Sequence, residues 1–536
     1  MTLPKFVGIE NEYGFFLPED YQNTKWFRKY RQRGAGLTPT DVVVLKIIDS
    51  TALPSFKGEE QHVFSIGDKS GVEIVDVLKG LPPKTKNAYR EVLRMLGASG
   101  RMLSNGARFY IDLGHPEFST AESTSIIKVI AADKAGERIV ESARKKIEEE
   151  LDIDIRIHKD NSDRFGHSFA THENYLLEPE TFEEIITPGS EKGIQLINFL
   201  VSRPILCGAG KVGSEIPEGT ETNYQISQRA DFIVTKWDED TRTSRAIINT
   251  RDRPYADPKR FRRFHNIIGD ANLCEYACFL KLGVTAIFLK MLEDDFIKKS
   301  GSFLQYPLES PVLALRIVSR DLSLKEPLAL GNGKTVTGLN ILEETLRLEN
   351  LYFEKEALPS EEEKETLKIF EFFMTALKED WTQLYGYSDW VTKYLVISRA
   401  QQKTGLKWDS LPLKRMDWRY HDTNPELSHY SVLDKEGKIK HLLSEAEIAQ
   451  AVKEPPPGRA YLRGKCIDRF GEKINTMSWD FIHFKTKKAN FRMALPNPSI
   501  EQEVAEEVLN RLTSLFSGKL RSLEQTKDIS FTWSST

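Results

Sequence analysis

Residues 104–119, SNGARFYIDLGHPEFS, decide the fold class because they combine a β-strand pattern with acidic and basic side chains. The aromatic and β-branched residues at 109–111 favour a strand, on which alternate side chains point to opposite faces. We therefore expect Arg108, Tyr110 and Asp112 on one face and the apolar residues between them in the core. A surface strand tolerates Arg and Asp equally well, so this segment alone does not establish an active site.

The segment VGIENEYGFF near the N-terminus repeats the arrangement, because Glu10 and Glu12 are two positions apart and share one face of a strand. Two carboxylates on one face repel each other unless a cation lies between them. Mg²⁺ takes carboxylate oxygens as ligands and keeps open positions for water and phosphate. The pair therefore predicts a site for a hard divalent cation.

Three further clusters supply polar groups that a metal and nucleotide site needs. They contain His172 in THENYLL, Arg229 in ISQRADFIV, and Arg251 and His265 in NTRDRPYADPKRFRRFHN. Arginine is a permanently charged, fork-shaped donor that suits phosphate. A lone histidine is more often structural and an arginine-rich loop is usually solvated, so each cluster is weak evidence by itself. Together they predict a sheet whose polar face holds a magnesium–ATP phosphoryl-transfer site.

Length and composition describe a globular protein of 536 residues and 61.3 kDa, for which the length predicts two to four domains. The 75 basic and 79 acidic residues give a net charge of −4, which does not indicate a nucleic-acid-binding protein. No apolar run approaches the roughly 20 residues of a membrane helix, and the first residues lack a secretory pattern. We therefore expect a cytoplasmic protein without nucleic-acid or membrane partners.

A glycine motif, CGAGKVGSE, has the G-x-G-x-x-G spacing of a dinucleotide-binding turn at residues 208–213. That motif requires a helix to begin at the third glycine. Here Pro217 and Gly219 lie inside the would-be first turns, so the dinucleotide interpretation fails. We interpret the segment as a flexible loop close to the site, with a plain surface turn as the alternative.

The remaining pattern predicts these elements along the chain: an extended segment at 42–48, an amphipathic helix at 124–151, strand, loop and strand at 155–177, a buried helix at 265–293, two or three helices within 360–405, a break at 455–457, a small α/β module after it, and a C-terminal helix with a polar tail. Polar and apolar side chains alternate poorly within residues 15–103. We interpret these residues as a lid or substrate-facing loop, and a disordered decoration is the alternative.

The order of the motifs GIENEYG, NGARFYIDLGHPEFS, THENYLL, QISQRADFI, IINTRDRPYAD and RRFHNIIGDANL resembles the Pup ligase and Pup deamidase/depupylase family (PafA/Dop). The resemblance continues through RAYLRGKCIDRFG and SWDFIHF. It implies an α+β, glutamine-synthetase-like fold, in which a curved antiparallel sheet packed with helices forms a cradle for ATP and Mg²⁺. We expect a catalytic domain at 1–425, a small C-terminal α/β domain at 426–500, and a helix and tail at 501–536.

The resemblance also implies roles for single residues. The expected metal ligands are Glu10, Glu117, His172 and His265, with Glu12 assisting from the same strand face, and the expected ATP-contacting residues are Tyr110, Arg229, Arg251 and, beside the nucleobase, Trp479. Asp112 falls on the family's essential aspartate. It would act either as a base for the incoming lysine or, in a cleaving enzyme, as the nucleophile or the activator of water. The sequence does not decide between these roles.

Both branches of the family act on the isopeptide bond between the C-terminal Glu of Pup, a ubiquitin-like modifier, and a substrate lysine. The ligase forms it through a γ-glutamyl phosphate, whereas the depupylase cleaves it and deamidates a Pup that ends in Gln. The long stretch between Gly8 and Asn105, together with RAYLRGKCIDRFG, favours the depupylase. Asn11 is ligase-like, and Arg253 and Tyr255 depart from the usual TRDEPHAD, so a ligase or a different Pup-like modifier remains open.

Two interpretations come from other classes. A γ-glutamyl-cysteine-ligase-like enzyme acting on small molecules would share the acids and the sheet. A catalytically inactive binding module would keep the fold with a broken site. The presence of Glu10, Asp112, His172 and Arg251 argues against the inactive module. We therefore expect an enzyme whose partners are Pup, or a Pup-like modifier, and the proteins conjugated to it.

Overall fold

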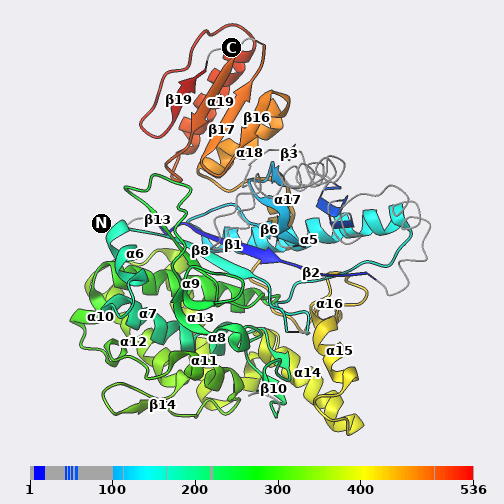
Figure 1. The fold of residues 1–536 in the computed structure, drawn as a ribbon, viewed down its shortest axis with the longest axis vertical. Coiled ribbons are helices and arrows are strands. Elements are labelled where there is room, and N and C mark those ends of the chain that lie inside the picture. The colour runs from blue at the N-terminus through cyan, green and yellow to red at the C-terminus, as the bar shows by residue number, and fades with distance from the viewer. Residues whose placement is uncertain are drawn as a thin grey trace, which may run out of the picture. The chain divides into compact units, whose positions relative to one another are not determined.

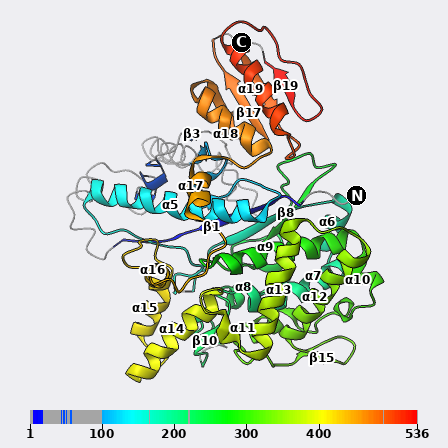
Figure 2. The ribbon, with the colours of Figure 1, turned by 180° about the vertical axis from the view of Figure 1, so that it is seen from behind.

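The computed structural model describes residues 5–17, 43–44, 46–48, 50–51, 55–57, 100–112, 114–164, 166–217, 221–487 and 489–534. These residues form two compact units, each assembled from separate stretches of the chain (Figures 1 and 2). The first unit takes its residues from 1–14, 122–134 and 158–448, and the second from 15–121, 135–157 and 449–536. Most of the predicted lid at 15–103 lies outside the described residues. The division at 425 and 500 stays a prediction.

The first unit contains three antiparallel strands in the order β13, β8, β1. The central strand is β8 (Thr171–Leu177), which pairs with β1 (Val7–Glu12) on one side and with β13 (Arg262–Asn266) on the other. The predicted strand, loop and strand at 155–177 are confirmed, because β7 (Arg156–His158) precedes β8 and pairs with β2 (Gly14–Phe16).

Helices of the first unit gather on one side of β8 and β13, where α9 (Glu275–Glu293) contacts β8 (Figure 1). This helix is apolar around nearly its whole circumference, as expected for a buried helix. The prediction of a helix from residue 265 is wrong for its first ten residues. Although Ile267, Ile268 and Ala271 resemble an apolar helical face, the preceding residues pair with β8, and tertiary pairing overrides the local pattern.

The other helices and short ladders of the first unit complete its helical layer. The helices are α6 (Pro179–Ile186), α7 (Glu191–Ser202), α8 (Pro204–Cys207), α10 (Phe296–Lys299), α11 (Pro311–Arg320), α12 (Gly338–Lys355), α13 (Glu361–Glu379), α14 (Asp389–Thr404), α15 (Leu411–Tyr420) and α16 (His429–Lys435), with 3₁₀ turns η3 (Ala230–Phe232), η4 (Phe303–Gln305) and η5 (Trp381–Leu384). Two-residue strands form the ladders β9 (Lys211–Val212) with β10 (Tyr224–Gln225) and β14 (Leu328–Ala329) with β15 (Thr335–Val336), while β11 (Thr235–Asp238) pairs in parallel with β12 (Ala246–Asn249). The predicted helices within 360–405 are confirmed by α13 and α14.

The glycine motif at 208–213 forms no dinucleotide-binding turn, because it leads into β9 and no α-helix follows within the described residues 214–217. It is not a flexible loop either. Gly210 has a φ of +71°, and a Cβ there would lie 2.0 Å from the hydroxyl of Tyr224. Glycine is therefore required by close packing against β10.

A buried ion pair fixes the reverse face of β8 to the helical layer. Arg203 donates from Nη1 and Nη2 to the two carboxylate oxygens of Glu173, at 2.6 and 2.8 Å. Tyr175 and Asn266 donate to the same carboxylate, at 2.7 and 3.2 Å. Burial opposes the ionisation of Glu173, but the charge of Arg203 holds its pKa below the usual value. The pair therefore ties β8, β13 and the end of α7 together.

The substitution Glu173→Gln is expected to destabilise the protein by about 3 to 5 kcal/mol, because it leaves the Arg203 charge buried without a counterion. Urea unfolding followed by circular dichroism measures this loss. Glu361→Gln on the exposed start of α13 is the control, and it should change stability little. A loss of less than about 1 kcal/mol for Glu173→Gln would show that this pair does not hold the sheet to the helices.

The second unit contains four antiparallel strands in the order β6, β5, β4, β3. They are β3 (Ser55–Lys57), β4 (Arg101–Leu103), β5 (Arg108–Asp112) and β6 (His115–Ser119). The predicted alternation of β5 is confirmed, because Phe109 and Ile111 are buried. The predicted amphipathic helix is α5 (Ile126–Leu151), which contributes residues to both units, as does α17 (Glu445–Lys453).

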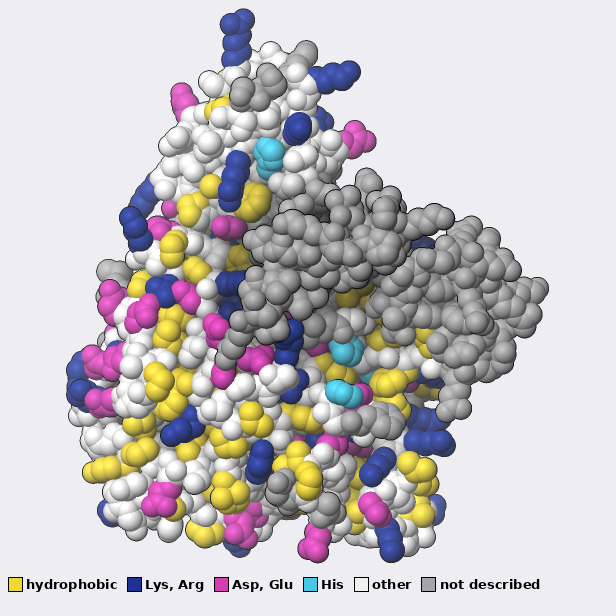
Figure 3. Space-filling model, viewed as in Figure 1, with side chains coloured by type: hydrophobic (Ala, Val, Ile, Leu, Met, Phe, Trp, Pro, Cys, Tyr) yellow, Lys and Arg dark blue, Asp and Glu magenta, His cyan; other side chains and the backbone are white. Residues whose placement is uncertain are grey.

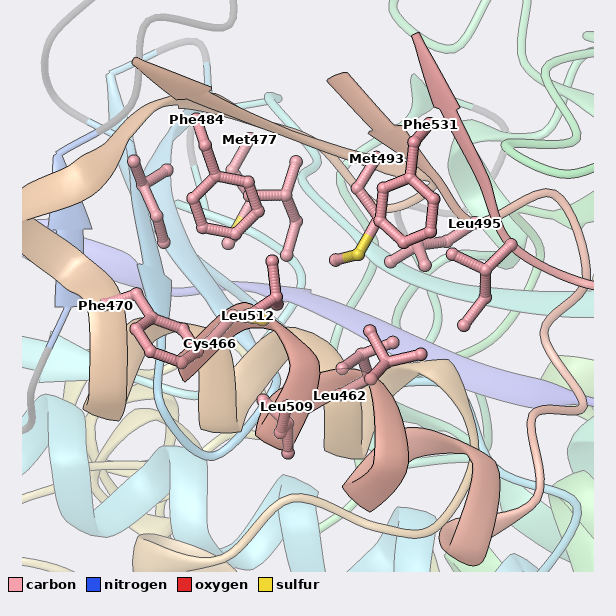
Figure 4. Close-up of a cluster of buried hydrophobic side chains, with 14 of the residues drawn as sticks. Leu462, Cys466, Phe470, Met477, Phe484, Met493, Leu495, Leu509, Leu512 and Phe531 are labelled. Carbon is pink, nitrogen blue, oxygen red and sulfur yellow. The ribbon is translucent and has the colours of Figure 1, made fainter. Parts of the chain in front are cut away.

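The C-terminal part of the second unit is a small α/β module, as predicted. Helices α18 (Arg459–Phe470) and α19 (Gln502–Phe516) pack on a sheet of β16 (Ile474–Met477), β17 (Phe481–Lys485), β18 (Asn490–Ala494) and β19 (Ser530–Trp533), with η6 (Gly471–Lys473) after α18. Figure 4 shows the apolar side chains of the two helices facing those of the sheet, among them Leu462, Phe484, Met493 and Leu509. The break at 455–457 separates α17 from α18, as expected from consecutive prolines.

One local prediction from the sequence is wrong. Residues 43–44 and 46–48 are helical rather than extended. Val43, Val44, Ile47 and Ile48 are all buried, and this i, i+1, i+4, i+5 spacing suits one face of a helix despite the β-branched side chains. The polar tail contains β19, which pairs with β18 and buries Phe531.

Two further features concern the charge of the surface and the apolar character of the helices. Figure 3 shows acidic and basic side chains interspersed over the described part of the visible face, in agreement with the small net charge. Among the helices of the described residues, none combines the length and the apolar character that a membrane crossing requires.

Candidate active site

The polar face of β1 and β8 carries Glu10 directly opposite His172. Opposed residues of an antiparallel pair lie on the same face of the sheet. Oε2 of Glu10 lies 3.3 Å from Nδ1 of His172, and Oε1 accepts a hydrogen bond of 3.0 Å from Nδ2 of Asn174. Asn174 is two positions after His172 and therefore shares its face. The strand register thus creates a carboxylate–imidazole pair.

Strand β13 adds a second imidazole to this face, because His265 lies opposite Asn174. Oδ1 of Asn174 accepts from Nη1 of Arg263 at 2.6 Å and lies 3.0 Å from Nδ1 of His265. Nδ1 of His265 also lies 3.1 Å from Nη1 of Arg263, and because these contacts are made at Nδ1, Nε2 is available as a metal ligand. The two imidazole rings meet edge to face, with their centroids 4.7 Å apart.

Glu10, His172 and His265 form a set that could hold a divalent cation, since one ligand atom from each lies within 4.8 Å of the others. Burial alone would raise the pKa of Glu10, but the hydrogen bond with His172 and nearby positive charge, including that of Arg263, hold it well below its usual range. Burial lowers the pKa of both histidines, and Arg263 lowers that of His265 further. A charged carboxylate with neutral imidazoles is the ionisation state that binds a metal.

The chemistry of this set fits a divalent cation without selecting Mg²⁺ alone. Carboxylate oxygens suit Mg²⁺ and Mn²⁺, whereas imidazole nitrogens suit softer metals. Glu12 adds a second carboxylate on the same strand face as Glu10, and it is buried.

Arg229 is buried, with 1% of its surface exposed, in the turn before η3 and not on a strand. The carboxylate of Asp270 holds this turn, because it accepts from the hydroxyl of Ser227 at 2.9 Å and from the amides of Gln228 and Arg229 at 2.8 and 3.2 Å. These hydrogen bonds satisfy the backbone of the turn in place of a strand ladder. The strand-like composition of the segment did not predict this carboxylate.

The guanidinium of Arg229 has no carboxylate partner among the described residues. Its Nη1 donates to the carbonyl of Phe169, which also accepts from Nδ2 of Asn161 at 3.1 Å, and its Nε makes no hydrogen bond. Burial and the charge of Arg245 lower its pKa to about 10, so the side chain still carries its charge at neutral pH. A buried guanidinium held only by carbonyl groups favours an anionic ligand.

Arg251 follows β12, and its amide donates to Oδ1 of Asn249 at 3.1 Å. The residue is half-buried, and its charge contributes to the lowered pKa of His265. In the first unit, two of the predicted arginines, Arg229 and Arg251, therefore act electrostatically on the set of Glu10, His172 and His265.

The second unit carries Tyr110, Asp112 and Glu117 on one face of the β5–β6 hairpin. Tyr110 lies opposite Glu117 and donates a hydrogen bond to its Oε1, and Asp112 lies opposite His115. Glu117 is buried, whereas Asp112 is partly exposed. The guanidinium of Arg108 lies 4.4 Å from the ring centre of Tyr110.

Trp479 lies between β16 and β17, in a different part of the second unit. The guanidinium of Arg463 lies 4.9 Å from its ring centre and donates to its carbonyl at 2.8 Å. The ring also packs against the apolar core of the C-terminal module. Its predicted place beside a nucleobase stays a prediction.

The sequence offered a signal for some of the additional residues. Asn174 has the same strand parity as His172, and Arg263 the same parity as His265, so both were recognisable as neighbours on the polar face. Asp270 gave no such signal, because it stands in the apolar segment NIIGDANL. Its role depends on the turn at 227–229, which is distant in sequence.

Comparison with known proteins identifies relatives of this chain. Residues 5–483 match the family described as Pup-ligase protein. The depupylase of Acidothermus cellulolyticus is 39% identical over 73% of this chain and 76% of its own length. The Pup deamidase/depupylase of Mycobacterium tuberculosis is 36% identical over the same shares. The Pup–protein ligase of Acidimicrobium ferrooxidans is 35% identical over 80% of this chain and 92% of its own length.

Two solved structures are similar to the described fold. The complex between Prokaryotic Ubiquitin-like Protein Pup and its ligase PafA has a TM-score of 0.73 at 26% identity and covers 98% of both chains. The Pup ligase PafA in complex with ADP has a TM-score of 0.68 at 29% identity and covers 85% of this chain and 98% of that one. These likenesses confirm the predicted α+β, glutamine-synthetase-like fold. With a family match that extends over most of its length, the chain belongs to the Pup-ligase protein family.

Proposed function

We propose that this protein is an ATP- and Mg²⁺-dependent depupylase, which hydrolyses the isopeptide bond between the C-terminal Glu of Pup and a substrate lysine and deamidates a Pup that ends in Gln. The observation that carries the proposal is the set of Glu10, His172 and His265 within 4.8 Å, in a chain 39% identical to a depupylase. The ADP complex of a similar ligase supports nucleotide binding. We expect the enzyme to work in the cytoplasm.

The proposed roles divide the residues into three groups. The metal ligands are Glu10, Glu12, Glu117, His172 and His265, the nucleotide-contacting residues are Tyr110, Arg229, Arg251 and Trp479, and Asp112 is the catalytic residue. A bound divalent cation would neutralise phosphate charge and polarise phosphoryl oxygens. Glu10 stays ionised beside neutral imidazoles, which prepares it for that cation.

Asp112 would act on the reacting bond either as general base or as nucleophile. Its partial exposure on the β5–β6 hairpin supports contact with a substrate, whereas Glu117 on the same face is buried and hydrogen-bonded to Tyr110. We therefore assign the chemistry to Asp112 and ligand binding to Glu117.

A Pup ligase is the second candidate. The two solved structures described above are of Pup ligases, and the ligase of Acidimicrobium ferrooxidans aligns over a larger share of this chain than the depupylase of Acidothermus cellulolyticus does. The ligase would use the same ATP site to transfer the γ-phosphate to the C-terminal Glu of Pup, and the substrate lysine amine would then displace inorganic phosphate to form the isopeptide bond. The two candidates form or hydrolyse the same bond and share the site residues.

The substitution Glu10→Gln is expected to lower the affinity for ATP in the presence of Mg²⁺ by at least about tenfold, because it removes an anionic metal ligand. Calorimetric titration with ATP at fixed Mg²⁺ measures this change, and Mn²⁺ is a parallel probe. Glu180→Gln at the exposed start of α6 is the control. Unchanged affinity in a folded Glu10→Gln variant would refute the assignment of Glu10.

The substitution Asp112→Asn keeps the size and the strand but removes basicity and nucleophilicity. We expect ATP affinity to be retained and turnover of a Pup conjugate to fall by about 10²- to 10⁴-fold. Single-turnover assays with excess enzyme measure the chemical step. If turnover persists, another group carries the chemistry, and Glu12 is the next candidate.

Incubation with ATP, Mg²⁺ and a Pup-modified protein is expected to release free Pup, and Pup ending in Gln should be converted to the Glu form. Pup ending in Glu, mixed with an unmodified acceptor protein, should give little conjugate. Mass spectrometry distinguishes all these products. Accumulation of conjugate together with stoichiometric ADP would establish the ligase. Inactivity in both directions would direct attention to Arg253 and Tyr255 and to a different modifier.

A further inference from the structure

Two arginines of the first unit bind consecutive peptide carbonyls. Arg229 donates to the carbonyl of Phe169, and Nη2 of Arg245 donates to the carbonyl of Ser168 at 2.8 Å. Because adjacent carbonyls belong to one short segment, the two guanidinium groups are held near each other by the same stretch of backbone. Arg245 is half-buried and was not singled out by the sequence patterns.

Several other arginines of the described residues are paired with carboxylates, whereas the buried Arg463 donates to the carbonyls of Trp479 and Gly106. Arg203 binds Glu173, Arg144 binds Glu141, and Arg164 binds Asp417. In contrast, neither Arg229 nor Arg245 forms an ion pair with a carboxylate in the part of the chain that the structure describes. These two arginines therefore lie on adjacent carbonyls of one segment without a direct counterion among the described residues.

The two uncompensated charges repel each other. Burial lowers the pKa of both arginines, and the positive charge of Arg245 lowers that of Arg229 further. The charge of Glu12 opposes the shift at both residues, and Asp240 and Asp270 each oppose it at one of them. Two guanidinium groups kept together at this electrostatic cost are typical of a site that awaits an anion.

We propose that Arg245 and Arg229 form a paired anion site that binds phosphoryl oxygens of a nucleotide. The ligand rests on the proposed function, whereas the pairing rests on the carbonyl contacts and on the missing carboxylates. Each guanidinium has five N–H donors, and one hydrogen bond apiece among the described residues leaves donors available for phosphate. Arginine forks match the spacing of phosphate oxygens.

The site is fixed before a ligand arrives. The backbone of Arg245 is held because its carbonyl accepts from the amide of Val234 at 2.9 Å. The backbone of Arg229 is held by Asp270, and the shared segment is held where Asn161 donates to the Phe169 carbonyl. A bound phosphate would therefore meet donors already in position, which lowers the entropic cost of binding.

The test compares Arg245→Met, Arg245→Lys and Arg229→Met in the full-length protein, with ATP, ADP and adenosine as ligands at fixed Mg²⁺. Arg245→Met is expected to weaken ATP binding about 10- to 100-fold, the effect of losing charge-assisted hydrogen bonds. Arg245→Lys should recover part of the affinity. Adenosine, which has no phosphate, should bind all variants equally. Arg242→Met in the same loop is the matched control, because its side chain is exposed.

Thermal unfolding without ligand separates an anion site from a structural role. Removing one of two repelling charges should leave the unfolding temperature of Arg245→Met unchanged or raise it, while the rise produced by ATP should shrink. An Arg245→Met variant that is less stable without ligand would indicate a structural arginine and overturn the inference.

The outcome also distinguishes this inference from the proposed function. If Arg229→Met loses ATP affinity and Arg245→Met does not, the pairing is wrong and the ATP site stands. If neither variant loses affinity, the pairing and the placement of the phosphates in this part of the first unit both fail. If both single variants lose ATP affinity, and the double variant loses no more than the product of their two fold-changes, a shared ligand is supported.

Discussion

The buried pair of Glu173 and Arg203 is the constraint on which the site geometry depends. Side chains alternate along β8, so residues 173 and 175 face the helical layer while 172 and 174 face the polar side. The carboxylate of Glu173 accepts from groups on α7, β8 and β13. Because Glu173 is held in place, its chain neighbours His172 and Asn174 are held at fixed positions on the polar face. A shift of one residue would exchange the two faces and destroy both arrangements.

Charge is distributed on these two faces by opposite principles. On the core face, opposite charges are matched within hydrogen-bonding distance, which stabilises the fold at the cost of desolvation. On the polar face, Glu10 lies beside neutral imidazoles and 3.5 Å from Nη1 of Arg263. Outside the strands, Arg229 and Arg245 are left without carboxylates. These are groups to which we assign ligands. A protein of this kind gives up some stability in its free state and regains it when metal and nucleotide bind.

Alternation is a local property, so the sequence predicted the strands that carry Glu10, His172, Tyr110 and Asp112. The segment after His265 was predicted as a helix, and the roles of His265 and Glu117 came from the resemblance. What the sequence did not predict depends on distant partners. Arg229 lies in a turn because Asp270 captures its amide, and β19 forms because β18 offers an edge. The helical residues 43–44 and 46–48 were predicted as extended because valine and isoleucine favour strands locally.

The pairing of β1 with β8 joins residues that are far apart in the chain, with Glu10 and His172 separated by 162 positions. Contacts of such high sequence separation form late, since the entropy of closing the long loop is lost before the contact repays it. Helices such as α9 and α13 can form early from local contacts. The carboxylate and the imidazoles therefore meet only when the sheet is complete. Partly folded chains lack this ligand set, so metal affinity reports the fraction of molecules that have finished folding.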